Sequence, residues 1–238
     1  RRGPDGLHRY AHIGTGNYNP ATARFYTDLG LFTADPETTA DLTDLFNQLT
    51  GSSRAPGSSY RRLLVAPATM LTGFLMRIDR ETEHAKAGRG GRIRAQLNGL
   101  EDPDIVAALY RASAAGVEVD LIVRSLTVLR PGLPGVSERI RVRSVLGRFL
   151  EHQRIYHFGN GGQDEYLIGS ADWRPRNLRR RVEVVTPVRG AALTARLDRL
   201  LSALISEPSA WILGPDGDYT RGSRPSPEHP HLHDRLIS

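Results

Sequence analysis

The sequence predicts an α/β fold in which one complete domain follows the end of another. Apolar strand-like runs alternate with amphipathic helices from residue 63 to residue 123, an order typical of a sheet flanked by helices. Residues 51–59 are rich in Gly and Ser, as linkers are. We therefore predict the end of a first domain at residues 1–50, a linker at 51–59, a second domain at 60–206 and a loose tail at 207–238.

The segment before the linker predicts a short strand, a turn and one helix. Residues 9–13 are extended in character and residues 17–20 have the composition of a turn. Asp35 followed by Pro36 is a helix start, because a carboxylate caps the first turn and Pro suits the first helical position. Apolar residues then recur at helical spacing, namely Leu42, Leu45, Phe46 and Leu49. We expect Gly51 to end this helix.

The segment after the linker predicts strands and helices in alternation. The expected elements are a strand at 63–66, a helix marked by Leu71, Phe74, Leu75 and Ile78, a strand at 92–98, a helix marked by Ile105, Leu109 and Ala112, and a strand at 117–123. This order favours a largely parallel sheet.

The second half predicts more strands and a closing helix. The strands lie near residues 140–145, 149–158 and 165–169, and the glycines at 159–162 fit a hairpin between the last two. The apolar stripe of the helix is formed by Leu193, Leu197, Leu200, Leu201 and Leu204. From about Pro208 the chain is rich in Pro, Gly, Ser and His, which predicts the loose tail.

The basic residues are almost all arginines. The 238-residue chain has a formal net charge of +6, and Lys86 is the only lysine among 32 basic residues. Guanidinium groups bind phosphate oxygens bidentately, so a phosphate-binding surface is one interpretation, and GC-rich codon usage is the other. The chain has no cysteine, which favours a reducing compartment. No apolar run approaches the ~20 residues that span a bilayer, so we expect no transmembrane segment.

Two similar half-motifs lie far apart in the chain. One is His152-Gln-Arg154 followed by Gly169-Ser-Ala-Asp172, and the other is Gly14-Thr-Gly-Asn17. A histidine beside an arginine and facing a Gly-Ser turn suits phosphoryl transfer, with Ser170 and the Gly169 backbone holding an oxygen. A purely structural histidine is the alternative. The same spacing places the partner histidine of Gly14 before residue 1, so we expect this chain to lack it.

The complete half-motif partly follows the phospholipase D signature, His-x-Lys, four residues, Asp, six residues, Gly-Ser-x-Asn. Three positions of this chain depart from it. Arg154 stands at the Lys position, Gly159 at the Asp position and Asp172 at the final Asn position. A phospholipase D-like phosphodiesterase or nuclease is therefore an alternative that these departures weaken.

Longer strings resemble the bacterial polyphosphate kinase family of the long, multidomain type, over residues 8 to 206. They are Tyr10-Ala-His-Ile-Gly-Thr-Gly-Asn-Tyr-Asn19, Thr22-Ala-Arg-Phe-Tyr-Thr-Asp28, Val123-Arg124 with Leu129-Arg-Pro-Gly132, Phe149-Leu-Glu-His-Gln-Arg-Ile-Tyr-His-Phe158 with Asn160-Gly-Gly162, and Gly169-Ser-Ala-Asp-Trp173 with Arg176-Asn-Leu178. The resemblance implies phospholipase D-like mixed sheets flanked by helices. It also implies reversible transfer of the ATP terminal phosphate, through a phosphohistidine and with Mg²⁺, to inorganic polyphosphate.

The resemblance assigns three ATP-contacting residues to this chain. They are Tyr26, Arg124 and His152, and His152 is also the catalytic candidate, matching the family's second essential histidine. Arg154, Ser170, Asp172 and Asn17 are supporting candidates. The phosphorylated histidine and the Mg²⁺ ligands of the family lie upstream, so no metal site is expected here, and His12 is interpreted as a sheet histidine. Gln96 stands where the family often has Lys, and Ser125 and Thr127 replace a frequent Gly and Cys.

The resemblance also implies partners and a location. We expect ATP and ADP, inorganic polyphosphate and a homo-oligomer, in the cytoplasm, with attachment to the inner face of the membrane left open. A run of arginines after the Gly-Ser turn either lines a polyanion channel or forms a solvated basic face: Arg174, Arg176, Arg179, Arg180 and Arg181. Interleaved aromatics are scarce, so we expect no nucleic-acid binding.

A non-enzymatic alternative remains for the chain by itself. With half of the active centre missing, it would be a module that binds polyanions without turnover, and we expect the isolated chain to be inactive.

Overall fold

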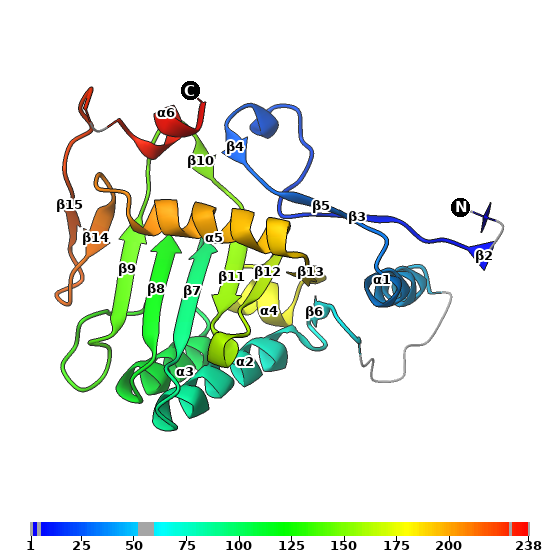
Figure 1. Ribbon diagram of the computed structural model, residues 1–238, viewed down its shortest axis with the longest axis horizontal. Helices are drawn as coiled ribbons and strands as arrows, with labels where there is room; N and C mark the ends of the chain where they lie inside the picture. The colour runs from blue at the N-terminus through cyan, green and yellow to red at the C-terminus, as the bar shows by residue number, and fades with distance from the viewer. Residues whose placement is uncertain (1, 4–5, 52–59, 229, 238) are drawn as a thin grey trace.

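The body of the protein is a nine-stranded mixed sheet with helices on both faces (Figure 1). The computed structural model describes residues 2–3, 6–51, 60–228 and 230–237. The strand order is β15-β14-β9-β8-β7-β11-β12-β13-β6. These strands are β6 (Leu64–Ala66), β7 (Arg92–Leu97), β8 (Glu118–Val123), β9 (Ile140–Ser144), β11 (Arg154–Phe158), β12 (Glu165–Gly169), β13 (Glu183–Val188), β14 (Trp211–Leu213) and β15 (Tyr219–Arg221).

The centre of this sheet is a βαβ unit. Helix α3 (Pro103–Ala114) joins β7 to β8, and its start is fixed by the Asp102 carboxylate, which accepts hydrogen bonds from the backbone N of Asp104 and of Ile105. The pairs β7–β8 and β8–β9 are parallel, and the other six pairings of the sheet are antiparallel. The expected α/β class with mixed sheets is confirmed, but the expectation of a largely parallel sheet was wrong.

The connections explain this mixture. A parallel pair needs a crossover of a dozen or more residues, which α3 and its flanking turns supply between β7 and β8, and which residues 124–139 supply between β8 and β9. Between β11 and β12 the chain makes only the short 3₁₀ turn η2 (Asn160–Gly162), so the two strands form the expected hairpin.

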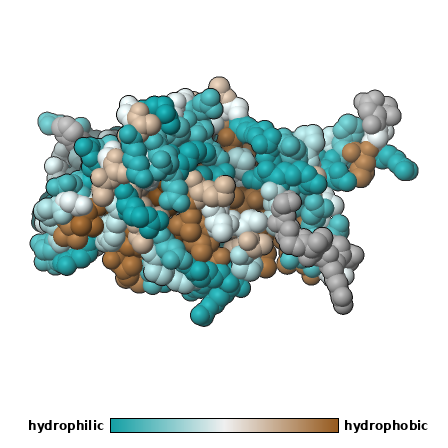
Figure 2. Space-filling view, turned by 90° about the horizontal axis from the view of Figure 1, so that it is seen from below, coloured by the Kyte–Doolittle hydropathy of each residue, from teal (hydrophilic) through white to brown (hydrophobic). Residues whose placement is uncertain are grey.

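Helices cover the two faces of the sheet separately. On one face lie α2 (Met70–Lys86), α3 and the short α4 (Pro175–Arg179), and on the other face lies α5 (Ala191–Ile205) (Figure 1). One apolar core, which includes Phe74 and Tyr156, packs under α2 and α3. A second core, which includes Ile155 and Leu201, packs under α5. Seen from below, hydrophobic side chains form separate patches among hydrophilic ones (Figure 2), which is ordinary for a protein surface.

The N-terminal part forms a small unit beside this sheet. Strands β3 (Ala11–Gly14) and β5 (Gly30–Thr33) pair antiparallel and are followed by α1 (Pro36–Leu49), and β1 (Arg2–Gly3) pairs with β2 (Gly6–Leu7). The expected cap of α1 is confirmed, because the Asp35 side chain accepts from the Thr38 backbone N at 2.8 Å. The expected end is confirmed too, since Gly51 has a φ of +71°.

A buried carboxylate of α1 joins this unit to the part of the chain that forms the main sheet. Asp41 is fully buried and accepts hydrogen bonds from the backbone N of Arg62 at 2.7 Å and of Leu63 at 3.1 Å. The expected linker lies between these two parts, and its residues 52–59 fall outside the described residues.

A second connection between the two parts is a short parallel pairing. Strand β4 (Tyr26–Thr27), which follows the 3₁₀ turn η1 (Thr22–Arg24), pairs with β10 (Leu150–Glu151) in the register Leu150↔Tyr26 and Glu151↔Thr27. The single strand expected at 149–158 is therefore two strands, β10 and β11, which pair with different partners. The strand is interrupted between them by His152 and Gln153, a position that we call the β10–β11 break.

The expectation of a loose tail at 207–238 was wrong for the described residues of that segment. Strand β14 pairs with β9 and with β15, so the tail extends the main sheet. A short helix, α6 (Leu232–Ile237), follows, and His231, Leu232 and His233 are buried. Within the part of the chain that the structure describes, no helix is both long enough and apolar enough to cross a membrane.

Candidate functional site

His152, the predicted catalytic histidine, lies at the break between β10 and β11. Its ring Nδ1 lies 2.9 Å from Oδ2 and 3.0 Å from Oδ1 of Asp28, and its side chain is 17% exposed. Nη1 of Arg154 lies 3.2 Å from Nε2 of the same ring. A carboxylate only accepts and a guanidinium only donates. The Asp28 carboxylate therefore places a proton on Nδ1, and Nε2 faces the Arg154 guanidinium.

The Gly-Thr-Gly-Asn string holds the aspartate. The Thr15 hydroxyl donates to Asp28 Oδ1 at 2.7 Å and accepts from the Leu29 backbone N at 2.9 Å. A Cβ at Gly16 would collide with the Asp28 carboxylate, so glycine is needed there for the close approach. The two half-motifs thus meet through Asp28, which the sequence reasoning did not select.

Tyr26 is brought to His152 by the β4–β10 pairing. The two ring centroids lie 4.6 Å apart with an interplanar angle of 37°. Phe25 packs edge-on against Tyr26 at 5.1 Å. Tyr26 and His152, which lie 126 positions apart in the sequence, are therefore neighbours, which no local pattern could indicate.

Arg124 lies directly after β8, at the carboxyl end of the parallel strands. Its Nε donates to Asn98 Oδ1 at 2.8 Å and to the Glu151 backbone O at 3.0 Å. Burial lowers the pKa of the Arg124 guanidinium below its ordinary value, and the nearby Arg154 cation lowers it further. Among the described residues, its terminal nitrogens make no hydrogen bond, so they remain available to a ligand.

Arg154 serves mainly to connect the parts of the site. Its Nη2 pairs with Asp172 Oδ2 at 3.1 Å, and its Nη1 donates to the backbone O of Thr15 at 3.2 Å. Asp172 also accepts from the Asn98 backbone N at 2.7 Å. Arg154 and Asp172 are both buried, so this ion pair is part of the framework around His152.

Other supporting candidates are engaged elsewhere. The Ser170 hydroxyl donates to Glu183, and this contact does not support the oxygen-holding role expected for Ser170. Asn17 accepts weakly from Thr22 at 3.4 Å. His12 lies on β3, where Nε2 is 2.9 Å from the Tyr18 hydroxyl, in agreement with a sheet histidine.

The arginine run after the Gly-Ser turn is largely paired with carboxylates. Arg174 pairs with Glu101, and Arg179 pairs with Asp102 at 2.9 Å. Arg181 lies 3.9 Å from Glu183. Only Arg176 and Arg180 of this run lack a carboxylate partner among the described residues, so the run offers less free positive charge than its sequence suggests.

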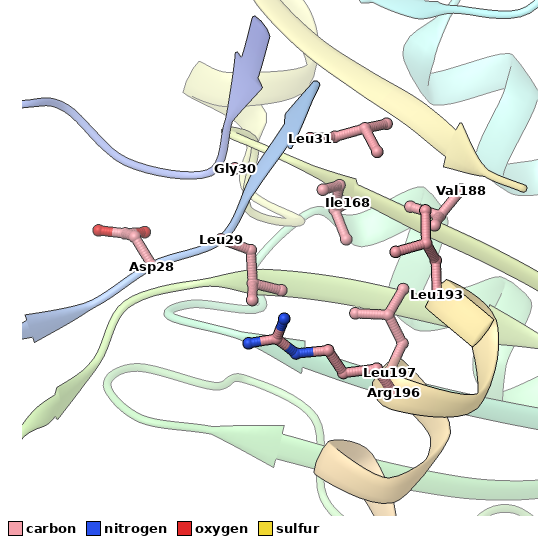
Figure 3. A pocket seen from close by; sticks show the side chains of 9 residues that line it. All are labelled: Asp28, Leu29, Gly30, Leu31, Ile168, Val188, Leu193, Arg196 and Leu197. Carbon is pink, nitrogen blue, oxygen red and sulfur yellow. The ribbon is translucent and has the colours of Figure 1, made fainter. Parts of the chain in front are cut away.

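Two cavities adjoin the site. One, of about 330 Å³, opens beside Arg124, and its lining includes Phe25, Arg148 and Phe149. The other, of about 170 Å³, has Asp28 at one side and apolar side chains of Val188, Leu193 and Leu197 at the other (Figure 3). The first combines aromatic and cationic side chains, whereas the wall of the second is mostly apolar.

The described residues do not form a metal site. None of their groups of three or more His, Cys, Asp or Glu could hold a metal ion. The carboxylates nearest to His152 and Arg124 are already paired, Asp28 with His152 and Asp172 with Arg154. The residues present therefore do not fit Mg²⁺.

Comparison with known proteins gives one family over nearly the whole chain. The family profile described as polyphosphate kinase C-terminal domain 2 matches residues 63–232, and that of polyphosphate kinase C-terminal domain 1 matches residues 1–55. Polyphosphate kinase of Thermosynechococcus vestitus is 55% identical over 93% of this chain and 30% of its own length. That of Mycobacterium avium is 54% identical over 100% of this chain and 32% of its own length.

A solved structure agrees with these relatives. The crystal structure of polyphosphate kinase from Porphyromonas gingivalis superposes with a TM-score of 0.89 and 37% sequence identity, over 97% of this chain and 35% of that chain. This chain thus spans about a third of the length of the relatives that it matches.

Proposed function

This chain belongs to the polyphosphate kinase family, and we propose that it supplies the ATP-contacting half of a polyphosphate kinase active centre. The reaction is the reversible transfer of the ATP terminal phosphate, through a phosphohistidine that is not among these residues, to inorganic polyphosphate. One observation carries the proposal: Tyr26, Arg124 and His152 come from three distant segments and converge on the β10–β11 break.

The proposed step has a simple bond balance. The bond between the terminal phosphorus and the oxygen bridging it to ADP breaks, and a bond from phosphorus to a histidine nitrogen forms. That bond then breaks as the terminal oxygen of polyphosphate attacks. Such transfers depend mainly on positioning and charge neutralisation.

The residues of this chain would serve that step in different ways. His152 presents Nε2, which can take up a proton and then donate it to a phosphate oxygen. Asp28 holds the ring in place through Nδ1. The terminal nitrogens of Arg124 are permanent donors for phosphate oxygens. Mg²⁺, when it accompanies the nucleotide, would neutralise phosphate charge, and we assign it no ligand in this chain.

The cavity beside Arg124 supports a nucleotide as the ligand. Its volume of about 330 Å³ lies at the lower end of small-molecule sites. Phe25 and Phe149 line this cavity together with Arg124 and Arg148, so it offers both aromatic and cationic contacts to a nucleotide. A nucleoside in this cavity would direct its phosphates to the histidine.

The phospholipase D-like alternative has less support. Arg154, at the signature's Lys position, is committed to Asp172 in a buried ion pair. Gly159, at the signature's Asp position, lies beyond the far end of β11, next to Arg92 and Glu81. A diesterase would need a free cation and a carboxylate at those positions.

Family membership supports further proposals about the whole protein. We infer that the partners are ATP, ADP and inorganic polyphosphate, that the protein assembles as a homo-oligomer, and that it acts in the cytoplasm, with or without attachment to the inner membrane face. We also infer that residues 1–50 end a first catalytic domain and that residues 60–206 belong to a second one. Since no second histidine among the described residues contacts His152, we expect the 238 residues alone to bind without turnover.

The test is a titration of the purified chain with a fluorescent ATP analogue and with labelled polyphosphate. Arg124→Ala and His152→Ala remove the two proposed contacts, whereas Arg176→Ala and His84→Ala remove an arginine and a histidine outside the site. We expect both site variants to weaken ATP-analogue binding at least tenfold and both controls to leave it within twofold. Equal losses in all four variants would indicate general charge attraction, and unchanged binding in the site variants would reject the proposal.

A further inference from the structure

We propose that His233, in the C-terminal helix α6, is a positioning residue of the ATP site. It acts through Glu151, the residue directly before His152. This inference rests on the proposed function, because it takes the segment around His152 to be the ATP site. Whether His233 holds that segment in place can be tested without any nucleotide.

Glu151 is the point where the elements of the site are joined. Its backbone O accepts from Arg124 Nε at 3.0 Å, and its strand β10 pairs with β4, which carries Tyr26. One residue further along the chain is His152. The backbone of Glu151 therefore touches or adjoins all three proposed ATP contacts.

The side chain of Glu151 is buried and must be held by protein groups. It is 4% exposed, and its Oε1 lies 2.6 Å from Nε2 of His233. Its Oε2 accepts from Gln96 Nε2 at 2.8 Å and from Gln153 Nε2 at 2.5 Å. A buried carboxylate that loses one of its donors pays a large desolvation cost, so the position of Glu151 depends on His233.

His233 also holds the other side of the same segment. The backbone N of Phe149 donates to its Nδ1 at 3.0 Å. Since an amide only donates, Nδ1 accepts, and the ring proton sits on Nε2 toward Glu151. One imidazole thus binds both Phe149 and Glu151, on either side of Leu150, with its side chain 1% exposed.

The contact between the tail and this segment is close. A Cβ at Gly147 would collide with His231 and come within 2.7 Å of His233 Nδ1. Glycine at position 147 therefore lets α6 lie directly against the loop that leads to β10. Phe149 also packs against His233, with ring centroids 5.5 Å apart.

Helix α6 is itself fixed to the body of the protein. Glu207, which follows α5 and is nearly fully buried, accepts from the Leu232 backbone N at 3.1 Å and pairs with Arg235 at 3.1 Å. Leu232 packs into the core under α5. His233 therefore transmits the position of α5 and the main sheet to the segment that carries His152.

The experiment compares the chain with three variants: His233→Ala, His233→Gln and His84→Ala. Gln keeps a side-chain N–H donor for Glu151, and His84 is a histidine near the end of α2, away from Glu151. Three measurements are made on each: amide hydrogen exchange of residues 149–153, the NMR titration of the His152 ring, and affinity for a fluorescent ATP analogue. Circular dichroism establishes that each variant is folded.

We expect His233→Ala to reduce the exchange protection of residues 149–153 about tenfold or more and to displace the His152 titration, with exchange elsewhere in the main sheet unchanged. ATP-analogue affinity falls about fivefold or more, His233→Gln recovers part of each effect, and His84→Ala matches the parent chain. If His233→Ala fails to fold, His233→Gln is compared with the parent in its place, and it should show the same changes to a smaller extent.

The two proposals fail in different ways. Unchanged exchange at 149–153 and an unchanged His152 titration in the folded His233 variants would overturn the positioning role. Changes that are equally large throughout the sheet would overturn it too, because they would show a general structural role. Absence of ATP-analogue binding by the parent chain would instead reject the proposed function, while the exchange and titration results would still decide the role of His233.

Discussion

His152 and His157 are close in sequence and each lies between an aspartate and an arginine, but the order of the partners is opposite. His152 has Asp28 at Nδ1 and Arg154 at Nε2. His157 has Arg94 at Nδ1, at 3.0 Å, and Asp164 at Nε2, at 2.7 Å. The two rings therefore hold their proton on different nitrogens.

Burial separates their roles. The His157 side chain is 1% exposed, and desolvation, reinforced by the Arg94 cation, lowers its pKa to about 4. It is a neutral link in a network under α5 that also contains Tyr166, whose pKa burial raises to about 12, and Asp198. The His152 side chain is 17% exposed at the edge of the site. The same residue types thus form a structural network at one position and the proposed ATP site at the other, and the two positions differ in solvent access.

The largest expected effect concerns the free energy of unfolding, which depends on pH because His157 is buried. Its folded-state pKa of about 4 lies below the ordinary 6.5, so the unfolded chain takes up a proton first as the pH falls. The stability associated with neutral His157 is present above pH 6.5 and is lost as the pH falls toward 4. Between pH 7 and pH 4.5 this loss is about 2 kcal/mol.

Urea unfolding at these two pH values measures the loss, and the parent chain is compared with His157→Gln. The difference in unfolding free energy between the two pH values should be smaller in the variant by about 2 kcal/mol. Tyr166→Phe retains His157 and should keep the parent's pH dependence. An identical pH dependence in His157→Gln would contradict the proposed difference between the two histidines.

The next effect concerns the charge that balances the buried Arg94. That charge is Asp198, whose Oδ1 lies 2.6 Å from Nη2 of Arg94. The hydrogen bond between them keeps the pKa of Asp198 below its ordinary value. Asp198→Asn should lower the unfolding free energy by about 1.5 kcal/mol, since Asp198 is itself half-exposed. Thermal denaturation measures this change. ATP-analogue affinity should stay within twofold, and a large loss of affinity would mean that the two networks are coupled.

A smaller effect is expected at the aspartate beside His152. Asp28→Asn retains an oxygen acceptor for Nδ1 but loses the negative charge. Affinity for the ATP analogue should fall about fivefold, or about 1 kcal/mol, with little change in melting temperature. Fluorescence titration tests this, with Asp164→Asn as the matched change beside His157. Equal effects of the two substitutions would remove the functional distinction between the histidines.

The smallest effect is expected from truncating Asp164. Its side chain is 57% exposed, so water can replace its hydrogen bond to His157. Asp164→Ala should cost about 0.5 kcal/mol of unfolding free energy, as measured by urea denaturation. A loss above about 2 kcal/mol would show that Asp164 is as important to its network as buried partners are.

Local patterns in the sequence predicted most of the helices and strands. The cap at Asp35, the periodicity of α5 and the βαβ order around α3 are properties of neighbouring residues, and the structure confirms them. The strand near residues 149–158 was placed correctly, but its break at His152 was missed, because β10 pairs with a distant partner. The tail was misjudged since its Pro- and Gly-rich composition conceals a few buried residues, such as Leu213 and His233.

The site was only partly visible for the same reason. His152, Arg124 and Tyr26 could be selected through strings that resemble a family. Asp28, Thr15 and Glu151 could not, since each matters through a contact across the fold. The one usable signal was Asp28 at the end of the string Thr22-Ala-Arg-Phe-Tyr-Thr-Asp28, which stands close to Tyr26.

The pairing of Asp28 with His152 spans 124 positions, and that of Glu151 with His233 spans another 82. A chain is synthesised from its N-terminus, and loops this long must close before their contacts contribute any stability. During translation the βαβ unit around α3 can fold while the centre around His152 still lacks its last contact. That centre is completed only when residue 233 has left the ribosome, so a nascent chain acquires most of its sheet before the proposed ATP site is complete.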